Sequence, residues 1–557
     1  MRSTRSLFPL ALSSCLALAC SDGSGPGNGP SLTCTEASTE ILAIGEHRIL
    51  DPTRDDACVR LPSAGAGGAE HLYVPVATEG QETEDGVSAP YAITGSDIPA
   101  AAAQTLRSNL LSAIQPPQSA SEFHRMLRQR ERALTENPSE VLFNNGRITR
   151  AGTPPPVFGE QRTFKVCTNQ RCSAFVDATA TAKVVGQRVA IFVDNDAPAG
   201  GYTDPQLTAV GNLFDDHLYP IDTTAFGRES DIDNNDAVIV LLTQAVNALS
   251  PDCDSTGNVV LGYFFGADLL PRSARNPGSN EAEIFYGLVP DPLNTRCGIS
   301  AEFALPLLPA TFIHELQHMI SFNQHVLVRG GTSEDTWLNE GLSHFAEELG
   351  GRRIPDTECP GSGSCVHDFI RGDLNNALEY LAAPEAHFLV QPDTSSGTLA
   401  ERGANWLFVR WLVDHFASDT LLGADLTRRL VATRGVGVAN VEAQTGIGFD
   451  VLVPEWQMTN YLDDLPEYQQ VSSRLRYKTW NFRGAADSLG QAYPLVPDLT
   501  SGPGYSHSSV LRAGSGRHVL VTQAGGASAV DLRLTAPSGE EPVSSSASPR
   551  IGLVRIR

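Results

Sequence analysis

The sequence has little positive charge for its size. Its 557 residues contain 40 Lys and Arg against 64 Asp and Glu, and the formal net charge at pH 7 is −24. A protein of this charge repels phosphate groups, so the composition disfavours nucleic acid and anionic lipid as partners. The chain also shows no convincing internal repeat, which disfavours a solenoid or propeller. At roughly 150 residues per domain, it is long enough for three or four globular units.

Long apolar runs are scarce as well. The apolar stretch near the N-terminus, residues 7–19, has 13 residues and is too short to cross about 30 Å of hydrocarbon as a helix. Arg2 and Arg5 precede it, and basic residues before a short apolar run are typical of an export signal. We therefore expect residues 1–19 to be a signal peptide and the rest of the chain to be exported.

A cysteine follows this stretch directly. Small residues just before Cys20 resemble the bacterial lipobox, in which the thiol takes a lipid, although Ala17 stands where Leu is usual. Residues 20–33 are rich in Gly, Pro and Ser, which is typical of a flexible tether. The sequence thus predicts a cell-envelope lipoprotein, periplasmic or surface-exposed, with a membrane anchor at Cys20. The alternative is an ordinary signal peptide cut after Ala19, which leaves Cys20 as a free thiol and the protein unanchored.

No C-x-x-C motif occurs in the sequence. Structural zinc sites built from Cys commonly use that spacing, so the remaining cysteines fit such a site poorly. An even number of cysteines in an exported chain favours disulfide bonds instead. The close spacing of two pairs and the sequence order of the others predict Cys167–Cys172, Cys359–Cys365, Cys34–Cys58 and Cys253–Cys297.

Local patterns divide the chain into several units. Residues 34–137 combine short β-like runs with helical stretches and are a candidate propeptide, and residues 138–158 form a Pro-rich linker. Residues 159–470 begin with strand patterns and become helical from about 308 to 465, and residues 483–557 return to β-like runs. We expect an α+β fold in which β-rich N-terminal and C-terminal accessory domains flank a larger central domain.

The central domain contains the motif H-E-x-x-H as His314, Glu315 and His318. On a helix, residues four apart lie on one face about 6 Å apart along the axis, so both imidazoles can reach one zinc ion. A bound zinc lowers the pKa of its water, and Glu315 is placed to take the proton as general base. With 13 His in the chain, only about 0.02 chance matches are expected, so the motif is a strong signal.

A catalytic zinc needs a third protein ligand, and a second helix offers one. Residues 332–350 begin with Thr, Ser and acidic residues and end at a Gly pair, which predicts a helix. Glu340 lies early in it, with 21 residues between it and His318. Two rivals, His344 and Glu347, share the face of Glu340. Glu347 lies about 10 Å from Glu340 along the axis, too far to bind the same ion, but it can accept the second N–H of a zinc-bound His. For both rivals the alternative is a solvated helix face.

These segments resemble the gluzincins, in which a second helix contributes a Glu ligand, and in particular the hyicolysin family of bacterial secreted zinc metallopeptidases. The resemblance rests on the H-E-x-x-H segment, on Leu-Asn-Glu-Gly-Leu around Glu340, and on apolar helix patterns at 403–413 and 440–446. It covers residues 160 to about 465. It implies a two-lobed metallopeptidase domain over 159–470, with zinc held by His314, His318 and Glu340 and with Glu347 bonded to one of the zinc-bound histidines.

The group that stabilises the oxyanion stays unassigned. Family members tend to carry a Tyr just before the Gly of the third segment, whereas this chain has Arg402. Gluzincins generally use a Tyr or His from a helix beyond the third ligand. Tyr380, His387 and His415 are eligible by type and position alone.

Two weaker features lie before the motif. Residues 231–236 place oxygen ligands at alternate positions, as calcium loops do, but Asp236 replaces the Gly of an EF-hand and Leu242 its final Glu. The region is therefore a candidate Ca²⁺ site, with a solvated acidic turn as the alternative. The aromatic runs at 262–266 and 283–286 are candidates for a sheet edge that binds extended peptide, with simple core strands as the alternative.

Together these observations predict an exported zinc endopeptidase that hydrolyses protein or peptide substrates through a zinc-bound water, with Glu315 as the base. A gluzincin-type aminopeptidase is one alternative, although the chain lacks a G-x-M-E-N segment for gripping a substrate N-terminus. The other is a catalytically silent surface protein that keeps the fold and binds through its β-rich ends.

Overall fold

A computed structural model describes most of the chain. The described residues are 34–35, 38–54, 57–96, 119–135, 153–250, 259–295, 297–359, 361, 363–395, 397–419, 422–469, 471–539 and 541–557. The expected signal peptide, the tether and Cys20 lie outside them, as do most of the expected linker and Cys253.

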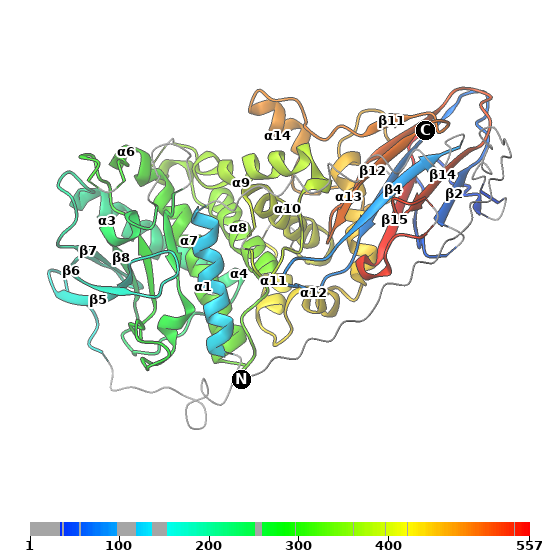
Figure 1. The fold of residues 1–557 in the computed structure, drawn as a ribbon. Helices are drawn as coiled ribbons and strands as arrows, with labels where there is room; N and C mark the ends of the chain where they lie inside the picture. The colour runs from blue at the N-terminus through cyan, green and yellow to red at the C-terminus, as the bar shows by residue number, and fades with distance from the viewer. Residues whose placement is uncertain are drawn as a thin grey trace, which may run out of the picture.

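The chain is a mixture of helices and several sheets, as expected for an α+β protein (Figure 1). The strands are β1 His47–Leu50, β2 Cys58–Leu61, β3 Ala69–Ala77, β4 Ser88–Gly95, β5 Gln161–Cys167, β6 Phe175–Val185, β7 Val189–Asp194, β8 Val238–Leu242, β9 Gly262–Phe264, β10 Ile284–Gly287, β11 Asp498–Thr500, β12 Ser506–Arg512, β13 Val519–Gln523, β14 Val530–Thr535 and β15 Pro549–Arg555. The α-helices are α1 Ser119–Thr135, α3 Asp204–Leu213, α4 Tyr219–Ala225, α5 Gln244–Asn247, α6 Ala301–Ala304, α7 Leu308–Phe322, α8 Thr336–Arg353, α9 Cys365–Ala382, α10 Leu399–Phe416, α11 Ala424–Val431, α12 Gly437–Thr445, α13 Phe449–Leu462 and α14 Phe482–Ser488.

A six-stranded sheet occupies one end of the molecule, in the order β5-β6-β7-β8-β10-β9 (Figure 1). β7, β8 and β10 run parallel, which buries β8 completely, as its unbroken apolar run predicts. β9 is antiparallel to β10 and lies at the edge of the sheet. Of the two aromatic runs proposed as an edge, the first therefore forms one, whereas the second is an interior strand.

The middle of the molecule is helical. α7 packs against β9 and β10 on one side and against α8 on the other, and α8 also packs against α9 and α10. All but one residue of α7 are buried, because the helix is enclosed by the sheet and by other helices rather than lying on the surface. The expected helical region from about 308 to 465 is confirmed by helices α7 to α13.

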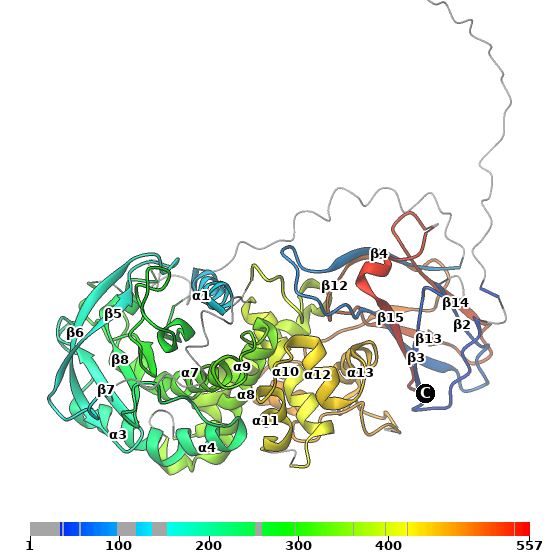
Figure 2. The same ribbon diagram turned by 90° about the horizontal axis from the view of Figure 1, so that it is seen from below.

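The two β-rich ends of the chain form one sandwich. One sheet has the order β1-β15-β3-β13-β11 and the other β12-β4-β14-β2, so each sheet combines strands from both ends of the chain (Figure 2). A buried apolar cluster between the sheets draws on both ends of the chain, with Tyr73 and Tyr91 from the first and Leu532 and Leu553 from the second. This differs from the expectation of two separate accessory domains, because strand periodicity shows which faces are apolar but not which strands pair.

Three of the expected disulfides are present: Cys34–Cys58, Cys167–Cys172 and Cys359–Cys365. The fourth pair includes Cys253, which is outside the described residues. Within the described part of the chain, we find no helix with the length and apolar character needed to span a bilayer.

The shared sandwich predicts that a defect at the C-terminus loosens strands at the N-terminus. Leu553 of β15 is fully buried and pairs with Tyr73 of β3. We expect Leu553→Ala to lower the free energy of unfolding by about 2–5 kcal/mol, because truncation leaves a cavity. Hydrogen exchange should accelerate at the amides of β3. Leu499→Ala, on a side chain that is 71% exposed, is the matched control and should change neither quantity. Unchanged exchange in β3 after Leu553→Ala would contradict the shared core.

Candidate metal centre

Helix α7 carries the H-E-x-x-H residues at the centre of the molecule. Its first turn contains Pro309, which fits a helix start because the missing N–H has no intrahelical partner there. His314, Glu315 and His318 are all buried. Their burial follows from the packing of α7 between the sheet edge and α8.

The structure brings His314 and His318 together with Glu340 of α8. The two imidazole Nε2 atoms are 3.1 Å apart, and the Glu340 carboxylate oxygens lie 3.6 Å from His314 Nε2 and 3.7 Å from His318 Nε2. Metal–ligand bonds of about 2.0–2.2 Å in a tetrahedron place neighbouring ligand atoms about 3.3–3.6 Å apart. The three side chains therefore have the spacing and the donor types that a zinc ion requires.

Glu340 itself provides a test of this fit. Its side chain is 1% exposed, and among the described residues neither carboxylate oxygen has a hydrogen-bond partner. Burial opposes its ionisation, but Arg402, His314 and His318 together hold the pKa of Glu340 well below its usual range. An ionised, buried carboxylate without hydrogen bonds is costly unless a cation balances it, so this carboxylate suits a metal ligand.

Polar partners behind the two histidines orient their rings. Glu347 Oε1 lies 2.7 Å from His314 Nδ1, so the His314 N–H points to a carboxylate and its Nε2 is left for a ligand role. Ser343 donates to Gln317 Oε1 at 2.5 Å and lies 3.2 Å from His318 Nδ1, from which its oxygen can accept. Glu347 thus lies where helix geometry predicted, against the far side of His314.

His344 lies beside the triad, with its ring centroid 4.9 Å from that of His314. Its Nδ1 contacts Asp373 of α9 at 2.8 Å and Glu347 at 2.9 Å. His344 is therefore part of a buried network that holds Glu347, and Asp373 is a member of that network that the sequence did not indicate.

Glu315 faces the sheet edge. Its Oε2 accepts a hydrogen bond of 2.7 Å from the backbone N–H of Phe264 at the end of β9. Burial raises the pKa of Glu315, with His314 and Arg128 acting in the opposite direction. The carboxylate therefore lies between the metal centre and the strand at the edge of the sheet.

None of the three residues proposed as oxyanion donors contacts the centre in the described contacts. The Tyr380 hydroxyl accepts from Gln457, and its ring stacks on Trp456. His387 lies beside Tyr380, and His415 contacts the carbonyl of Arg476.

Arg402 and His124 are two further polar residues near the ligands. The sequence analysis did not identify either of them as part of the site. Arg402 Nη1 lies 3.6 Å from Glu340 Oε2. His124 of α1 is buried close enough to Arg402, Glu340 and His314 to sense their charges, and burial followed by Arg402 lowers its pKa to about 3. His124 belongs to no local motif, and Arg402 was noted only as the residue that replaces a Tyr, so it is the fold that identifies both as neighbours of the ligands.

Helix α1 (Figures 1 and 2) packs against residues 266–269, the segment that follows the edge strand β9. Arg128 Nη2 donates to the Phe264 carbonyl at 2.8 Å, and Glu131 Oε1 accepts from the Gly266 N–H at 2.6 Å. A 2.8 Å hydrogen bond joins Arg128 to Glu131. The backbone groups at this edge are thus bonded to α1 as well as to Glu315.

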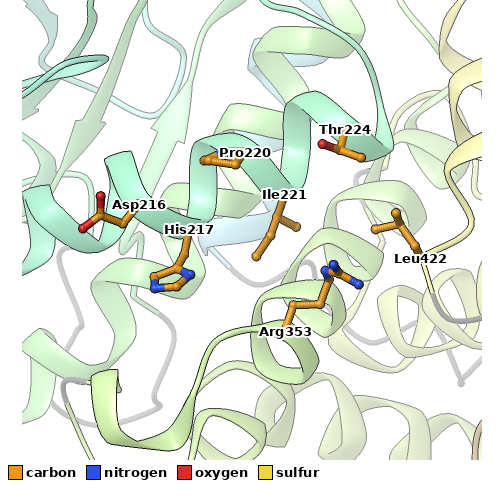
Figure 3. A pocket seen from close by; sticks show the side chains of 7 residues that line it. All are labelled: Asp216, His217, Pro220, Ile221, Thr224, Arg353 and Leu422. Atoms are coloured by element: carbon orange, nitrogen blue, oxygen red, sulfur yellow. The ribbon is translucent and has the colours of Figure 1, made fainter.

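A surface pocket of about 240 Å³ lies elsewhere in the helical region (Figure 3). Its lining comes mainly from the segment around α4, and it includes none of the residues of the metal centre. The lining residues are Asp216, His217, Pro220, Ile221, Thr224, Arg353 and Leu422. Figure 3 shows that its polar side chains, Asp216, His217, Thr224 and Arg353, do not converge on one point.

The geometry predicts an order of effects on zinc binding. Glu340→Ala should abolish stoichiometric zinc, because two protein ligands rarely hold a catalytic zinc tightly. Glu347→Ala should weaken affinity by about 10- to 100-fold through loss of the His314 orientation, and His344→Ala should leave it nearly unchanged. Zinc content after dialysis and competition with a chromophoric chelator measure both effects. Glu302→Ala, on an exposed helix face, is the control. Zinc lost in His344→Ala but kept in Glu340→Ala would contradict this site.

Comparison with known proteins gives a partial match. No family model matches the chain. Over 215 residues, the chain is 26% identical to the neutral metalloprotease ShpI of Staphylococcus hyicus; the match spans 38% of this chain and 42% of the length of that protein. The crystal structure of an M1 zinc metallopeptidase from Deinococcus radiodurans aligns with a TM-score of 0.28 and 14% identity, over 53% of this chain and 51% of that one. The sequence similarity is therefore to a metalloprotease, over part of the chain.

Proposed function

We propose that this protein is a zinc-dependent endopeptidase of the hyicolysin type. The observation that carries the proposal is the convergence of His314, His318 and Glu340, with ligand atoms within 3.1–3.7 Å, beside the buried carboxylate of Glu315. The partial similarity to a neutral metalloprotease supports the same activity.

A bound zinc ion supplies Lewis acidity, which polarises a peptide carbonyl and acidifies water. His314 and His318, through Nε2, and Glu340 would hold the metal, and Glu347 and Ser343 keep the two Nε2 atoms free by engaging Nδ1. Glu315 takes the proton of the attacking water at its carboxylate and delivers it to the leaving amine.

The edge strand β9 supplies a place for the substrate. An extended peptide can add to the open edge of a sheet through backbone hydrogen bonds. β9 is such an edge, and the Phe264 N–H contacts Glu315, so a peptide aligned on β9 lies next to the general base. This supports an endopeptidase, because the peptide can extend along the strand in both directions.

The central test is Glu315→Gln. We expect the variant to keep stoichiometric zinc, because Glu315 is outside the three-ligand set, and to hydrolyse a quenched fluorescent peptide at least about 100-fold more slowly. Wild-type protein should cleave the same peptide with an acetylated N-terminus equally well. Cleavage of only the free-amine peptide would indicate an aminopeptidase, and near-full turnover in Glu315→Gln would reject the general base.

A further inference from the structure

We infer that the protein has a second metal site, for a hard divalent cation such as Ca²⁺, formed by Asp231, Asp233 and Glu283. One ligand atom from each carboxylate lies within 4.8 Å of the others. Glu283 comes from the segment leading into β10, about 50 residues after the acidic loop, and the sequence pattern did not include it.

Two of the three carboxylates are buried with unused oxygens. Asp233 and Glu283 are 4% and 2% exposed, and neither Asp233 Oδ1 nor Glu283 Oε2 has a hydrogen-bond partner in the described structure. The other oxygens are engaged, Glu283 Oε1 by Ser230 and Ile232 and Asp233 Oδ2 by Asn235. These hydrogen bonds orient the unused oxygens and leave them for a ligand.

Charge and donor type indicate the class of ligand. Three neighbouring carboxylates carry three negative charges when ionised, and burial together with their mutual repulsion raises the pKa of Asp233 to about 6 and that of Glu283 to about 7. A bound divalent cation offsets both the burial of these carboxylates and their mutual repulsion. All the ligand atoms are oxygens, which favours Ca²⁺ or Mg²⁺ over zinc.

The position of the cluster gives the site a structural role. Residues 231–236 lead into β8 and Glu283 leads into β10, and these strands are parallel neighbours with Ile239 opposite Ile284. A cation there joins the starts of two strands, and the second of them supports the edge strand β9.

Calcium titration of the full-length, zinc-loaded protein tests this site. CaCl₂ should bind at one site by calorimetry and raise the Tm by at least about 2 °C. Glu283→Gln should weaken binding by at least about 10-fold, whereas Asp236→Asn, in the same loop but outside the cluster, should not. Without added cation, Glu283→Gln should have a higher Tm than wild type, because one repelling charge is gone, and with Ca²⁺ a lower one. No binding by wild type, or equal binding by Glu283→Gln, would overturn the site.

A separate observation concerns α1. We propose that α1 is an autoinhibitory element of the active site, an inference that rests on the proposed peptidase function. Phe123 and Leu127 are fully buried, and Phe123 packs edge-on against Tyr263 of β9 with ring centroids 4.8 Å apart. His124, on the same helix, is buried close enough to Glu340 and Arg402 for their charges to shift its pKa.

The polar side chains of α1 bind the backbone groups in and just after β9 that a substrate peptide would pair with. Arg128 bonds the Phe264 carbonyl and Glu131 bonds the Gly266 N–H, as an adjoining peptide strand would. Glu131 is 0% exposed, and its ion pair with Arg128 lets both charges be buried at this edge. A peptide cannot pair with these groups while α1 is docked, so substrate binding requires α1 to move away.

The test compares wild type with the double variant Arg128→Ala/Glu131→Ala. Loss of both contacts should raise kcat/KM on the quenched peptide by at least about 10-fold at unchanged zinc content, and hydrogen exchange in α1 should accelerate. Ala133→Ser, on the exposed face of α1, should change neither quantity. Equal activity in both proteins, with faster exchange in the double variant, would overturn autoinhibition while leaving the peptidase intact. No hydrolysis by either zinc-loaded protein would overturn the peptidase function on which it rests.

Discussion

The buried carboxylate of Glu340 is the constraint on which the arrangement of the centre depends. It must remain ionised beside His314 and His318 without a hydrogen bond among the described residues. This fixes both the rotation of α8 about its own axis and its position along α7. Small residues permit the close packing that this requires. A Cβ on Gly341, the next residue, would lie 2.8 Å from the Asn405 carbonyl of α10. Any larger residue there would force α8 and α10 apart and move Glu340 with them.

A polar network around Glu348, on another side of α8, fixes the rotation of α8 about its axis. Glu348 is fully buried and accepts from the indole N–H groups of Trp406 and Trp480, while Arg410 and Arg352 lie within ion-pair distance of it. Such a network constrains the orientation of α8, because every donor must hydrogen-bond to the same carboxylate. The hydrogen bonds at Glu348 and the close contact at Gly341 together specify how α8 presents Glu340 and Glu347 to α7.

The parts of the site that could be predicted from sequence are those encoded by local spacing. His314, Glu315 and His318 share one helix, and Glu340 and Glu347 share another, so helix geometry alone placed them on common faces. Arg402, His124 and Glu283 could not be found this way, because tertiary packing brings them to their partners from distant segments. The sandwich shows the same limit at the level of the fold, since β3 and β15 both read as strands, but nothing local identifies them as neighbours.

The pairing of the first strands with the last also has a consequence for the time course of synthesis. Thr78, just after β3, bonds to Ser548, just before β15, across 470 residues of chain. At a translation rate of about 5–20 residues per second, β3 therefore waits roughly 25–95 s for its partner after it has been made. The helical region can fold during that interval, because its contacts are closer in sequence, whereas the sandwich can form only when the final residues arrive. Strand β15 thus sets the moment at which the sandwich can form.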